Sequence, residues 1–212
     1  MEKASDMLKI WGRANSTNVK KILWVVEELD LVYQRIDAGG AFGVVNDPAF
    51  RVMNPNGLVP VLEDGDVVLW ESNTILRYLA ARYGDAGFNP VDPVARAQAE
   101  KWMDWVTSTI ATPFRDVFWG MIRTPAADRD MAKIEAAAKV VAGHLSVVDT
   151  VLAKQDYLSG ETFGVGDIPL GCFIYAWFEM PIDRPDHPHL AAWYERLKSR
   201  PAYQNAVMKP LS

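Results

Sequence analysis

One segment, residues 54–83, constrains the fold of this chain more than any other. Within it, two short apolar runs at 59–62 and 67–69 flank the sequence Glu-Asp-Gly-Asp, which predicts two antiparallel strands joined by a tight turn. An amphipathic pattern follows the second run and predicts a helix over 71–83. The segment therefore predicts a strand-strand-helix unit.

The residues before this segment predict a strand-helix-strand unit. Residues 8–12 and 32–37 are expected to form strands, and the apolar spacing between 19 and 31 predicts an amphipathic helix. A helical crossover makes the two strands a parallel pair. Residues 38–52, which contain three glycines and a proline, predict an irregular loop. Together the two units predict a small mixed sheet with helices packed on it.

The second half of the chain has a different pattern. Residues 85–93 are rich in Gly, Pro and Asp and predict a linker. Beyond the linker no strand pattern remains, and helices are predicted over 94–119, 126–154, 167–180 and 190–200, with a last short helix from Pro201. We therefore expect an α/β domain over residues 1–84 and an all-helical domain over residues 94–212.

Composition excludes several classes of function. The 212 residues carry a formal net charge of −5, which argues against nucleic acid as a partner. No apolar run approaches the ~20 residues of a membrane span, and the N-terminus lacks the apolar core of a signal peptide. The single cysteine, Cys172, excludes a disulfide framework. We expect a cytoplasmic protein with no membrane contact and no metal site, His187-Pro-His189 being a solvated helix start.

The Val59-Pro60 dipeptide is the first candidate binding element. A proline at the start of a strand cannot donate to the sheet. If its peptide bond is cis, the turn leaves the N–H and C=O groups of Val59 free to pair with a bound peptide, as in strand addition. A trans edge proline accounts for the sequence equally well.

Two further candidates lie at predicted helix starts. The backbone N–H groups of Glu71 and Ser72 form a possible carboxylate site, and the Glu71 side chain could hold an ammonium group, although both residues could also simply cap the helix. Ser16 stands at a strand-to-helix junction, where a hydroxyl can donate to a thiolate sulfur. A hydrolase-type role for Ser16 is unconvincing because no Gly-x-Ser-x-Gly motif surrounds it.

Taken together, the motifs at 54–62, at 71–79 and around Ser16 resemble those of the cytosolic glutathione S-transferases, in particular the bacterial theta-like or related classes of the Ser/Asn type. Residues 164–170 resemble the start of that family's buried helix. The resemblance implies a thioredoxin-like N-terminal domain that binds glutathione, followed by an all-helical C-terminal domain that forms the substrate site. The family usually has Ser or Thr where this chain has Gly164, but Asp167 can still complete half of a capping box.

The resemblance also assigns roles by position. It implies that Ser16 or Asn18 activates the thiol, that Val59 binds the cysteinyl backbone ahead of a cis Pro60, and that Glu71 and Ser72 hold the γ-glutamyl end. Leu58 stands beside the glycyl end, where relatives often have Lys, Arg or Gln, so the glycyl carboxylate lacks that cation here. The electrophile is expected to contact four aromatic residues: Trp105, Phe114, Phe118 and Trp119.

The implied activity is transfer of the glutathione thiolate to a small hydrophobic electrophile by a homodimer with a role in detoxification. Two alternatives stay open. Asn18 beside Ser16 is compatible with a glutathione-dependent disulfide reductase or peroxidase at the same site. The departure at Leu58 is compatible with a non-catalytic, transferase-like protein that carries a ligand or binds a partner.

Overall fold

The computed structural model describes residues 7–212 of the chain. Strands β1 (Leu8–Trp11), β2 (Tyr33–Ile36), β3 (Val61–Asp64) and β4 (Val67–Trp70) form one sheet in the order β2-β1-β3-β4. β1 pairs parallel with β2, whereas β1–β3 and β3–β4 are antiparallel. The strand-helix-strand and hairpin units predicted from the sequence are therefore confirmed, and they join through β1 and β3.

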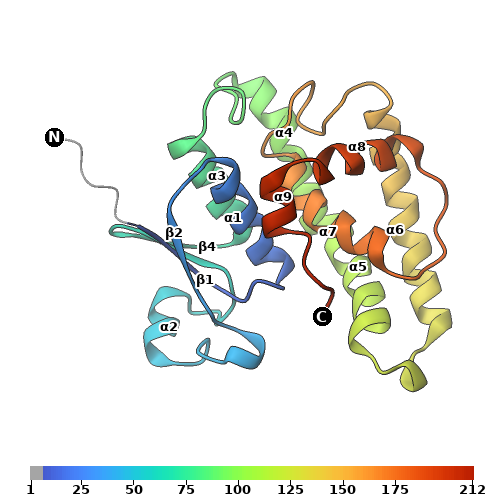
Figure 1. Ribbon diagram of the computed structural model, residues 1–212, viewed down its shortest axis with the longest axis horizontal. Coiled ribbons are helices and arrows are strands. Elements are labelled where there is room, and N and C mark those ends of the chain that lie inside the picture. Colours follow the sequence, from blue (N-terminus) through green and yellow to red (C-terminus); the bar gives the residue numbers. More distant parts are fainter. Residues whose placement is uncertain (1–6) are drawn as a thin grey trace.

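Helices cover both faces of this sheet (Figure 1). α1 (Thr17–Glu28) and α3 (Ser72–Tyr83) pack on one face, and α2 (Pro48–Met53) lies on the other. Side chains alternate along each strand, so neighbouring residues of one strand reach different cores. In β3, Leu62 belongs to the large core under α1 and α3, whereas Val61 packs with Phe50 of α2.

The prediction of an irregular loop over residues 38–52 was wrong in part, because α2 begins at Pro48 and a short 3₁₀ turn, η1 (Gly40–Phe42), precedes it. Proline at the first turn of α2 costs the helix no hydrogen bond, since that N–H has no partner within a helix anyway.

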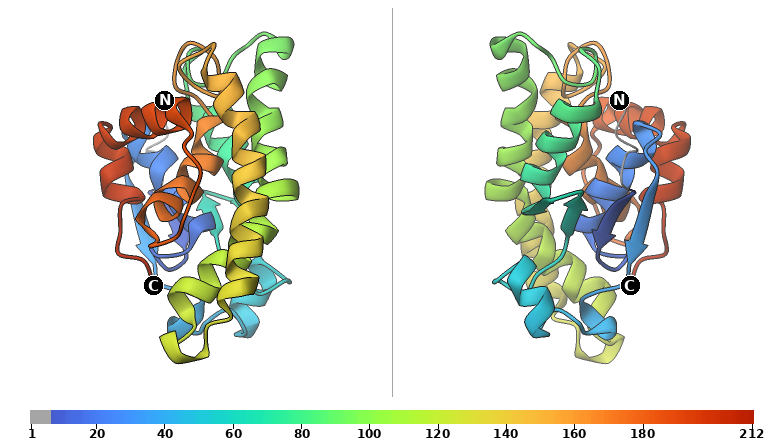
Figure 2. Two further views of the ribbon diagram at one scale, coloured as in Figure 1. Left: turned by 90° about the vertical axis from the view of Figure 1, so that its right-hand side faces the viewer. Right: turned by 90° about the vertical axis from the view of Figure 1, so that its left-hand side faces the viewer.

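The second half is all helical, as predicted (Figure 2). Its helices are α4 (Pro93–Trp105), α5 (Ala111–Phe118), α6 (Met131–Leu152), α7 (Asp167–Glu179), α8 (Pro188–Lys198) and α9 (Pro201–Ala206), with a 3₁₀ turn, η4 (Ala126–Asp128), before α6. Two π-helical segments, η2 (Val106–Ile110) and η3 (Trp119–Arg123), make α4, α5 and their extension one continuous rod. The rod continues through Gly120 and does not end at residue 119 as predicted. A Cβ at residue 120 would lie 2.5 Å from Cγ1 of Ile134 in α6. Gly120 therefore permits close helix packing.

The start of α7 is fixed by a buried carboxylate. Asp167 accepts hydrogen bonds from the backbone N–H groups of Leu158 (2.7 Å), Ser159 (3.2 Å) and Gly164 (3.1 Å) and from Nε1 of Trp193 (2.9 Å). The bond from Gly164 is the backward contact predicted for a capping box. Gly164 has no side-chain hydroxyl to cap the helix start. The hydroxyl of Ser159 serves this helix start instead, since its Oγ accepts from the N–H of Gly166 at 3.0 Å.

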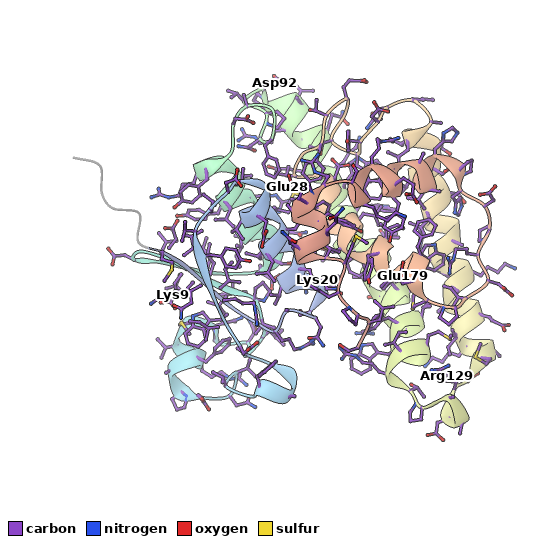
Figure 3. The ribbon with its side chains drawn as sticks, viewed as in Figure 1. Lys9, Lys20, Glu28, Asp92, Arg129 and Glu179 are labelled. Carbon is purple, nitrogen blue, oxygen red and sulfur yellow. The ribbon has the colours of Figure 1, made fainter. Side chains whose placement is uncertain are left out.

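The sheet and the helical part share one continuous core. The ring of Trp24 in α1 packs against Phe163 and Tyr203, and a Cβ on Gly171 of α7 would lie 2.6 Å from that indole. At the edge of this contact, Arg200 forms a two-pronged pair with Glu28 at 2.7 Å (Figure 3 labels Glu28). The fixed interdomain packing holds any site between the two parts in place. Within residues 7–212, no helix is long and apolar enough to cross a lipid bilayer.

Candidate functional site

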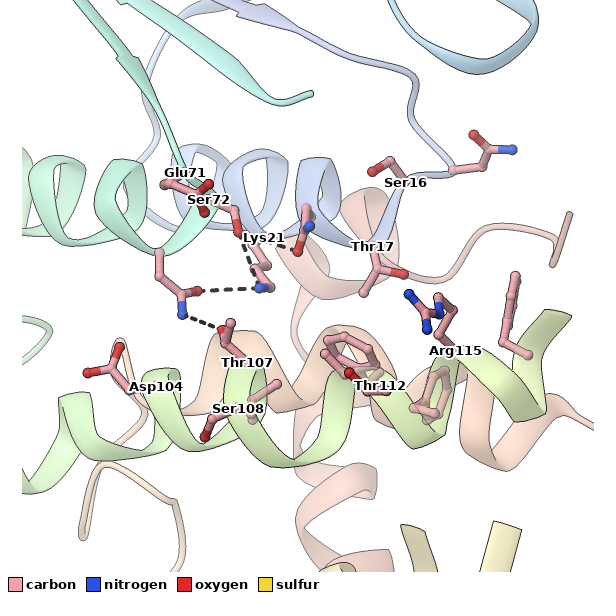
Figure 4. A pocket seen from close by; sticks show the side chains of 18 of the residues that line it. Ser16, Thr17, Lys21, Glu71, Ser72, Asp104, Thr107, Ser108, Thr112 and Arg115 are labelled. Carbon is pink, nitrogen blue, oxygen red and sulfur yellow. Dashed lines mark hydrogen bonds between the residues drawn. The ribbon is translucent and has the colours of Figure 1, made fainter. Parts of the chain in front are cut away.

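A cavity of about 620 Å³ opens between the two parts of the fold. It is bounded by the N-terminal ends of α1 and α3 on one side and by the rod of α4, η2 and α5 on the other (Figure 4). Seven of the residues singled out from the sequence line it: Ser16, Asn18, Glu71, Ser72, Phe114, Phe118 and Trp119. Two helix N-termini therefore point their partial positive charge toward one space.

Ser16 is the N-cap residue of α1, but its hydroxyl makes no capping bond to that helix. The residue is half-buried and its backbone is held by bonds to Arg13 (Ser16 N–H to the Arg13 carbonyl, 3.1 Å) and from Lys20 (2.9 Å). A rigid backbone with an uncommitted hydroxyl at a helix N-terminus suits the stabilisation of an anion in the cavity.

Asn18 lies in the first turn of α1. Its Oδ1 accepts from the hydroxyl of Ser72 at 3.3 Å, so it is tied to the head of α3. Ser72 in turn accepts from Nζ of Lys21, also at 3.3 Å. The head of α3 is thus connected to α1 by a short chain of polar contacts.

Lys21 is a functional candidate that sequence reasoning missed. Its ammonium group is buried and donates to Ser72 and to Oδ1 of Asn73 at 3.3 Å, and Asn73 continues the network by donating to Oγ1 of Thr107 at 3.1 Å. Burial lowers the pKa of Lys21 to about 8, against opposing effects of the charges of Cys172 and Glu71. The sequence hint was the position of Lys21 within the otherwise mostly apolar run Val19–Val26 of α1, which the structure shows to be buried throughout.

Glu71 holds an unusual backbone conformation at the head of α3. It has a φ of 71°, in the left-handed region that side chains other than glycine rarely adopt, and its side chain is exposed at the cavity. Such conformations persist where the surroundings enforce them and are common at functional sites. The conformation places the Glu71 carboxylate and the buried Ser72 on the same rim.

The peptide bond between Val59 and Pro60 is cis, which resolves the alternative left open by the sequence. Val59 precedes β3, and within residues 7–212 neither its N–H nor its carbonyl takes part in a backbone hydrogen bond. A recess of about 60 Å³ adjoins the main cavity there and shares three of its lining residues. Its lining consists of Asn18, Asn54, Asn56, Leu58, Val59, Pro60, Glu71 and Ser72.

Leu58 is 64% exposed beside this recess and offers no charge to a ligand. The sequence offers three other cations for the glycyl carboxylate, Arg13, Lys20 and Arg51; Arg13 does not line this recess, and the other two are engaged elsewhere. Arg51 donates to the carbonyl of Pro55 (2.6 Å) and to Oδ1 of Asn46 (2.8 Å), and Lys20 is buried and donates to the carbonyl of Val207 (2.9 Å). The departure noted from the sequence therefore persists in the folded chain.

The helical side of the cavity is aromatic. Phe114 and Phe118 of α5 stack at 19° with their centroids 6.4 Å apart, and Phe114 meets Phe173 edge-on at 5.0 Å. Trp105, which we expected in the substrate pocket, is not among the lining residues. Its ring packs edge-on against Trp102 and His144 instead, because the rod turns that face of the helix toward α6.

Cysteine and metal chemistry have no support in this cavity. Cys172 is buried outside the lining, and burial raises the pKa of its thiol to about 12. Across residues 7–212 there is no group of three or more His, Cys, Asp or Glu side chains placed to hold a metal ion. His187 precedes α8 at the N-cap position without a side-chain capping bond, and its Nε2 lies 2.9 Å from Oγ of Ser146.

Comparison with known proteins places these features in a family. Residues 7–81 match the family model of the glutathione S-transferase N-terminal domain, and residues 99–201 match that of the C-terminal domain. The chain is 47% identical over 208 residues to glutathione S-transferase GstB of Escherichia coli K12, covering 97% of this chain and 100% of that protein. It is 32% identical to glutathione S-transferase 3 of Zea mays, over 94% of this chain and 93% of that one.

A solved structure agrees with these sequence relatives. The theta class glutathione S-transferase of the citrus canker pathogen Xanthomonas axonopodis pv. citri, crystallised with glutathione bound, superimposes with a TM-score of 0.93. It is 57% identical, and the match covers 97% of this chain and 99% of that one. Two domain models, full-length relatives and a full-length structural match agree, and the chain belongs to the glutathione S-transferase family.

Proposed function

We propose that this protein is a glutathione S-transferase that joins the glutathione thiolate to a small hydrophobic electrophile. The observation that carries the proposal is the single cavity in which the uncommitted hydroxyl of Ser16, the polar head of α3 and the aromatic side chains of α5 meet. The chain up to residue 84 would bind glutathione, and residues 94–212 would supply most of the electrophile site.

In the proposed mechanism, glutathione lies along the rim between the recess and Ser16. The free N–H and carbonyl of Val59 pair with its cysteinyl backbone, while Ser72 and the α3 N-terminus hold the γ-glutamyl carboxylate and Glu71 holds the ammonium group. Ser16 donates to the sulfur, and the helix dipole of α1 adds to this effect, so the thiol pKa falls from its usual value of about 8.5. The thiolate then attacks an electrophile packed against Phe114, Phe118 and Trp119.

The direct test is conjugation of glutathione to 1-chloro-2,4-dinitrobenzene, followed by absorbance of the product. We expect saturable turnover and a rate that rises with pH through the pKa of the bound thiol. Absence of turnover with this and other electrophiles, together with calorimetry that shows no binding of glutathione at millimolar levels, would instead select the non-catalytic alternative.

No observation favours the disulfide reductase or peroxidase reading over transfer. The cavity lining contains no cysteine that could form a mixed disulfide. Asn18, which raised that possibility, contacts Ser72 at the head of α3. Turnover of a glutathione mixed disulfide without turnover of a chloronitrobenzene would reverse this assignment.

We also propose a cytoplasmic homodimer with a role in detoxification. Apolar side chains of the edge strand β4 and of the start of α4 support an interface between copies, since Val67, Val68, Trp70 and Val94 are all exposed in the single chain. Sedimentation of the purified protein measures the oligomeric state, and a monomer at micromolar concentration would contradict the dimer.

Lys21→Met is expected to weaken glutathione binding about tenfold while leaving the protein at least as stable at pH 7. The buried ammonium lies behind Ser72, where it favours a bound carboxylate. Keeping it charged costs on the order of 3 kcal/mol of folding free energy, because its pKa is lowered to about 8. Calorimetry with glutathione and urea unfolding measure the two effects.

The pH dependence of stability checks the same assignment. Between pH 8 and the unfolded value of 10.5, the native chain binds fewer protons at Lys21 than the unfolded chain, so the wild type gains stability from this group as pH rises. The stability difference between Lys21→Met and the wild type should therefore shrink across that window. A constant difference would contradict the lowered pKa of the buried Lys21.

Leu58→Lys is expected to lower the KM for glutathione about two- to fivefold, the effect of one exposed ion pair with the glycyl carboxylate. Leu58→Met is the matched control, since it keeps an apolar side chain of similar size at the same exposed position. Added salt should remove the gain of the lysine variant. Equal KM values for the two variants would show that the glycyl end lies away from residue 58.

A further inference from the structure

We propose that the electrophile site selects substrates that carry a negative charge, such as a carboxylate, on a flat apolar body. This inference rests on the transferase function proposed above and specifies its substrate class. It is carried by three arginines, Arg13, Arg115 and Arg123, which all line the cavity that holds Ser16.

The three guanidinium groups come from different elements. Arg13 belongs to the loop between β1 and α1, Arg115 to α5, and Arg123 to the end of η3. Figure 4 shows Arg115 directed from α5 toward Thr17, across the cavity from the helical side. Arg123 lies over the rings of Phe118 and Trp119, 5.7 and 5.5 Å from their centroids. Cationic and aromatic groups thus share one end of the site.

These arginines have few acidic partners. Arg13 donates to the amide oxygen of Asn15 at 2.8 Å, and Arg123 donates to the terminal main-chain oxygen of Ser212, the last residue of the sequence, at 3.1 Å. No Asp or Glu side chain pairs with either of them in the described part of the chain, 7–212. Arg115 approaches only Asp116, at 3.8 Å, and Asp116 does not line the cavity.

Arg13 and Arg123 line the same cavity, and the charge of one acts on the other. Burial lowers the pKa of Arg13, and the positive charge of Arg123 lowers it further. Two like charges held near each other, in a chain whose net charge is −5, indicate a place where an anion would be favoured.

Acidic side chains line only one end of the cavity. Glu71 and Asp104 lie where α3 begins, together with the cations Lys21 and Arg77, and Asp104 is paired with Arg77 at 2.7 Å. The opposite end holds the three arginines together with Phe114, Phe118 and Trp119. Glutathione's ammonium group therefore fits the first end, and an aromatic or conjugated carboxylate fits the second.

The arginines could in principle hold the glycyl carboxylate of glutathione instead. Their position argues against this, because none of them lines the recess formed by Leu58, Val59 and Pro60. Arg115 and Arg123 belong to the helical part of the fold, beside the aromatic side chains. The two roles change different quantities: a role in electrophile binding changes kcat/KM for the charged probe, whereas a role at the glycyl carboxylate changes the KM for glutathione.

The probes are 4-(chloromethyl)benzoate and 4-(chloromethyl)benzamide, which differ in charge and share the reacting group. In both, the thiolate sulfur forms a bond to the benzylic carbon, and chloride leaves with the electrons of the carbon–chlorine bond. After normalisation to the uncatalysed thiolate reaction, we expect kcat/KM for the benzoate to exceed that for the benzamide about tenfold or more. Added sodium chloride should reduce this preference.

Arg115→Gln and Arg123→Gln should each reduce the preference about three- to tenfold through the benzoate alone. Arg96→Gln on α4 is the control, because Arg96 does not line the cavity. Equal normalised rates for the two probes in the wild type would overturn the proposal. So would arginine variants that raise the KM for glutathione with both probes, a result that would assign the arginines to the glycyl carboxylate.

Failure of the underlying function gives a different result. If neither probe nor 1-chloro-2,4-dinitrobenzene is turned over, both the transferase function and the anionic substrate class are rejected. Turnover of 1-chloro-2,4-dinitrobenzene with no preference for the charged probe leaves the transferase intact and rejects only the anionic substrate class.

Discussion

Ser16→Ala is expected to raise the pKa of the enzyme-bound glutathione thiol by about 1–2 pH units, since it removes one hydrogen bond to a charged sulfur. At pH 7 the thiolate fraction falls, so kcat/KM should drop about 10- to 100-fold. The Ser16 hydroxyl is free for this role because it makes no capping bond to α1. Titration of the thiolate absorbance in the binary complex measures the pKa directly.

The pH profile distinguishes this role from a structural one. With the hydroxyl gone, the rate of the variant should recover as pH rises past the raised thiol pKa, whereas a distorted site would stay slow at every pH. Ser16→Thr keeps the hydroxyl and should keep the pKa close to that of the wild type. An unchanged pKa in Ser16→Ala, with a raised one in Asn18→Ala, would assign thiol activation to Asn18 instead.

Asp167→Ala is expected to destabilise the protein by at least about 4 kcal/mol, because it leaves four donors without their acceptor at about 1–3 kcal/mol each. Three are backbone N–H groups and the fourth is Nε1 of Trp193, and the carboxylate that they share is fully buried. Burial raises the pKa of Asp167, and the donors oppose that change. A loss of this size is a large part of the roughly 5–15 kcal/mol that stabilises a typical protein.

Asp92→Ala provides the comparison. Asp92 also accepts from a helix N–H, that of Ala95 at 2.8 Å, but it is exposed at the start of α4, so its removal should cost only about 1 kcal/mol. Urea unfolding of both variants measures the difference, and Asp167→Asn, which keeps one acceptor oxygen, should fall between them. Equal losses for the two alanine variants would mean that the Asp167 network contributes nothing beyond an ordinary cap.

Local patterns in the sequence determined most of the fold. The Glu-Asp-Gly-Asp turn between apolar runs specified the hairpin, and the spacing of apolar residues specified the main helices, because both depend on residues close together in the chain. The polar residues at Ser16 and at Glu71-Ser72 marked the helix starts that meet at the cavity. The short helix α2 was not predicted, because its six residues are too few to show a clear helical spacing of apolar side chains.

Contacts between distant residues decided the rest. A lysine in a helix does not reveal that its ammonium will be buried behind Ser72, and a tryptophan does not reveal that its ring will face His144, as that of Trp105 does, away from the cavity. The hydroxyl of Ser159 reaches the start of α7 only because the loop that carries Ser159 folds back to that helix.

The same holds for the charge of the electrophile site. Arg13 and Arg123 are far apart in the sequence and line one cavity only because α1 packs on the helical part. The sequence by itself therefore determined the fold and the family, and it supplied most candidate residues for the proposed glutathione half of the site, since these rest on short motifs. Only the tertiary structure decided which side chains line the electrophile half, because that surface is assembled from segments that are neighbours in space and not along the chain.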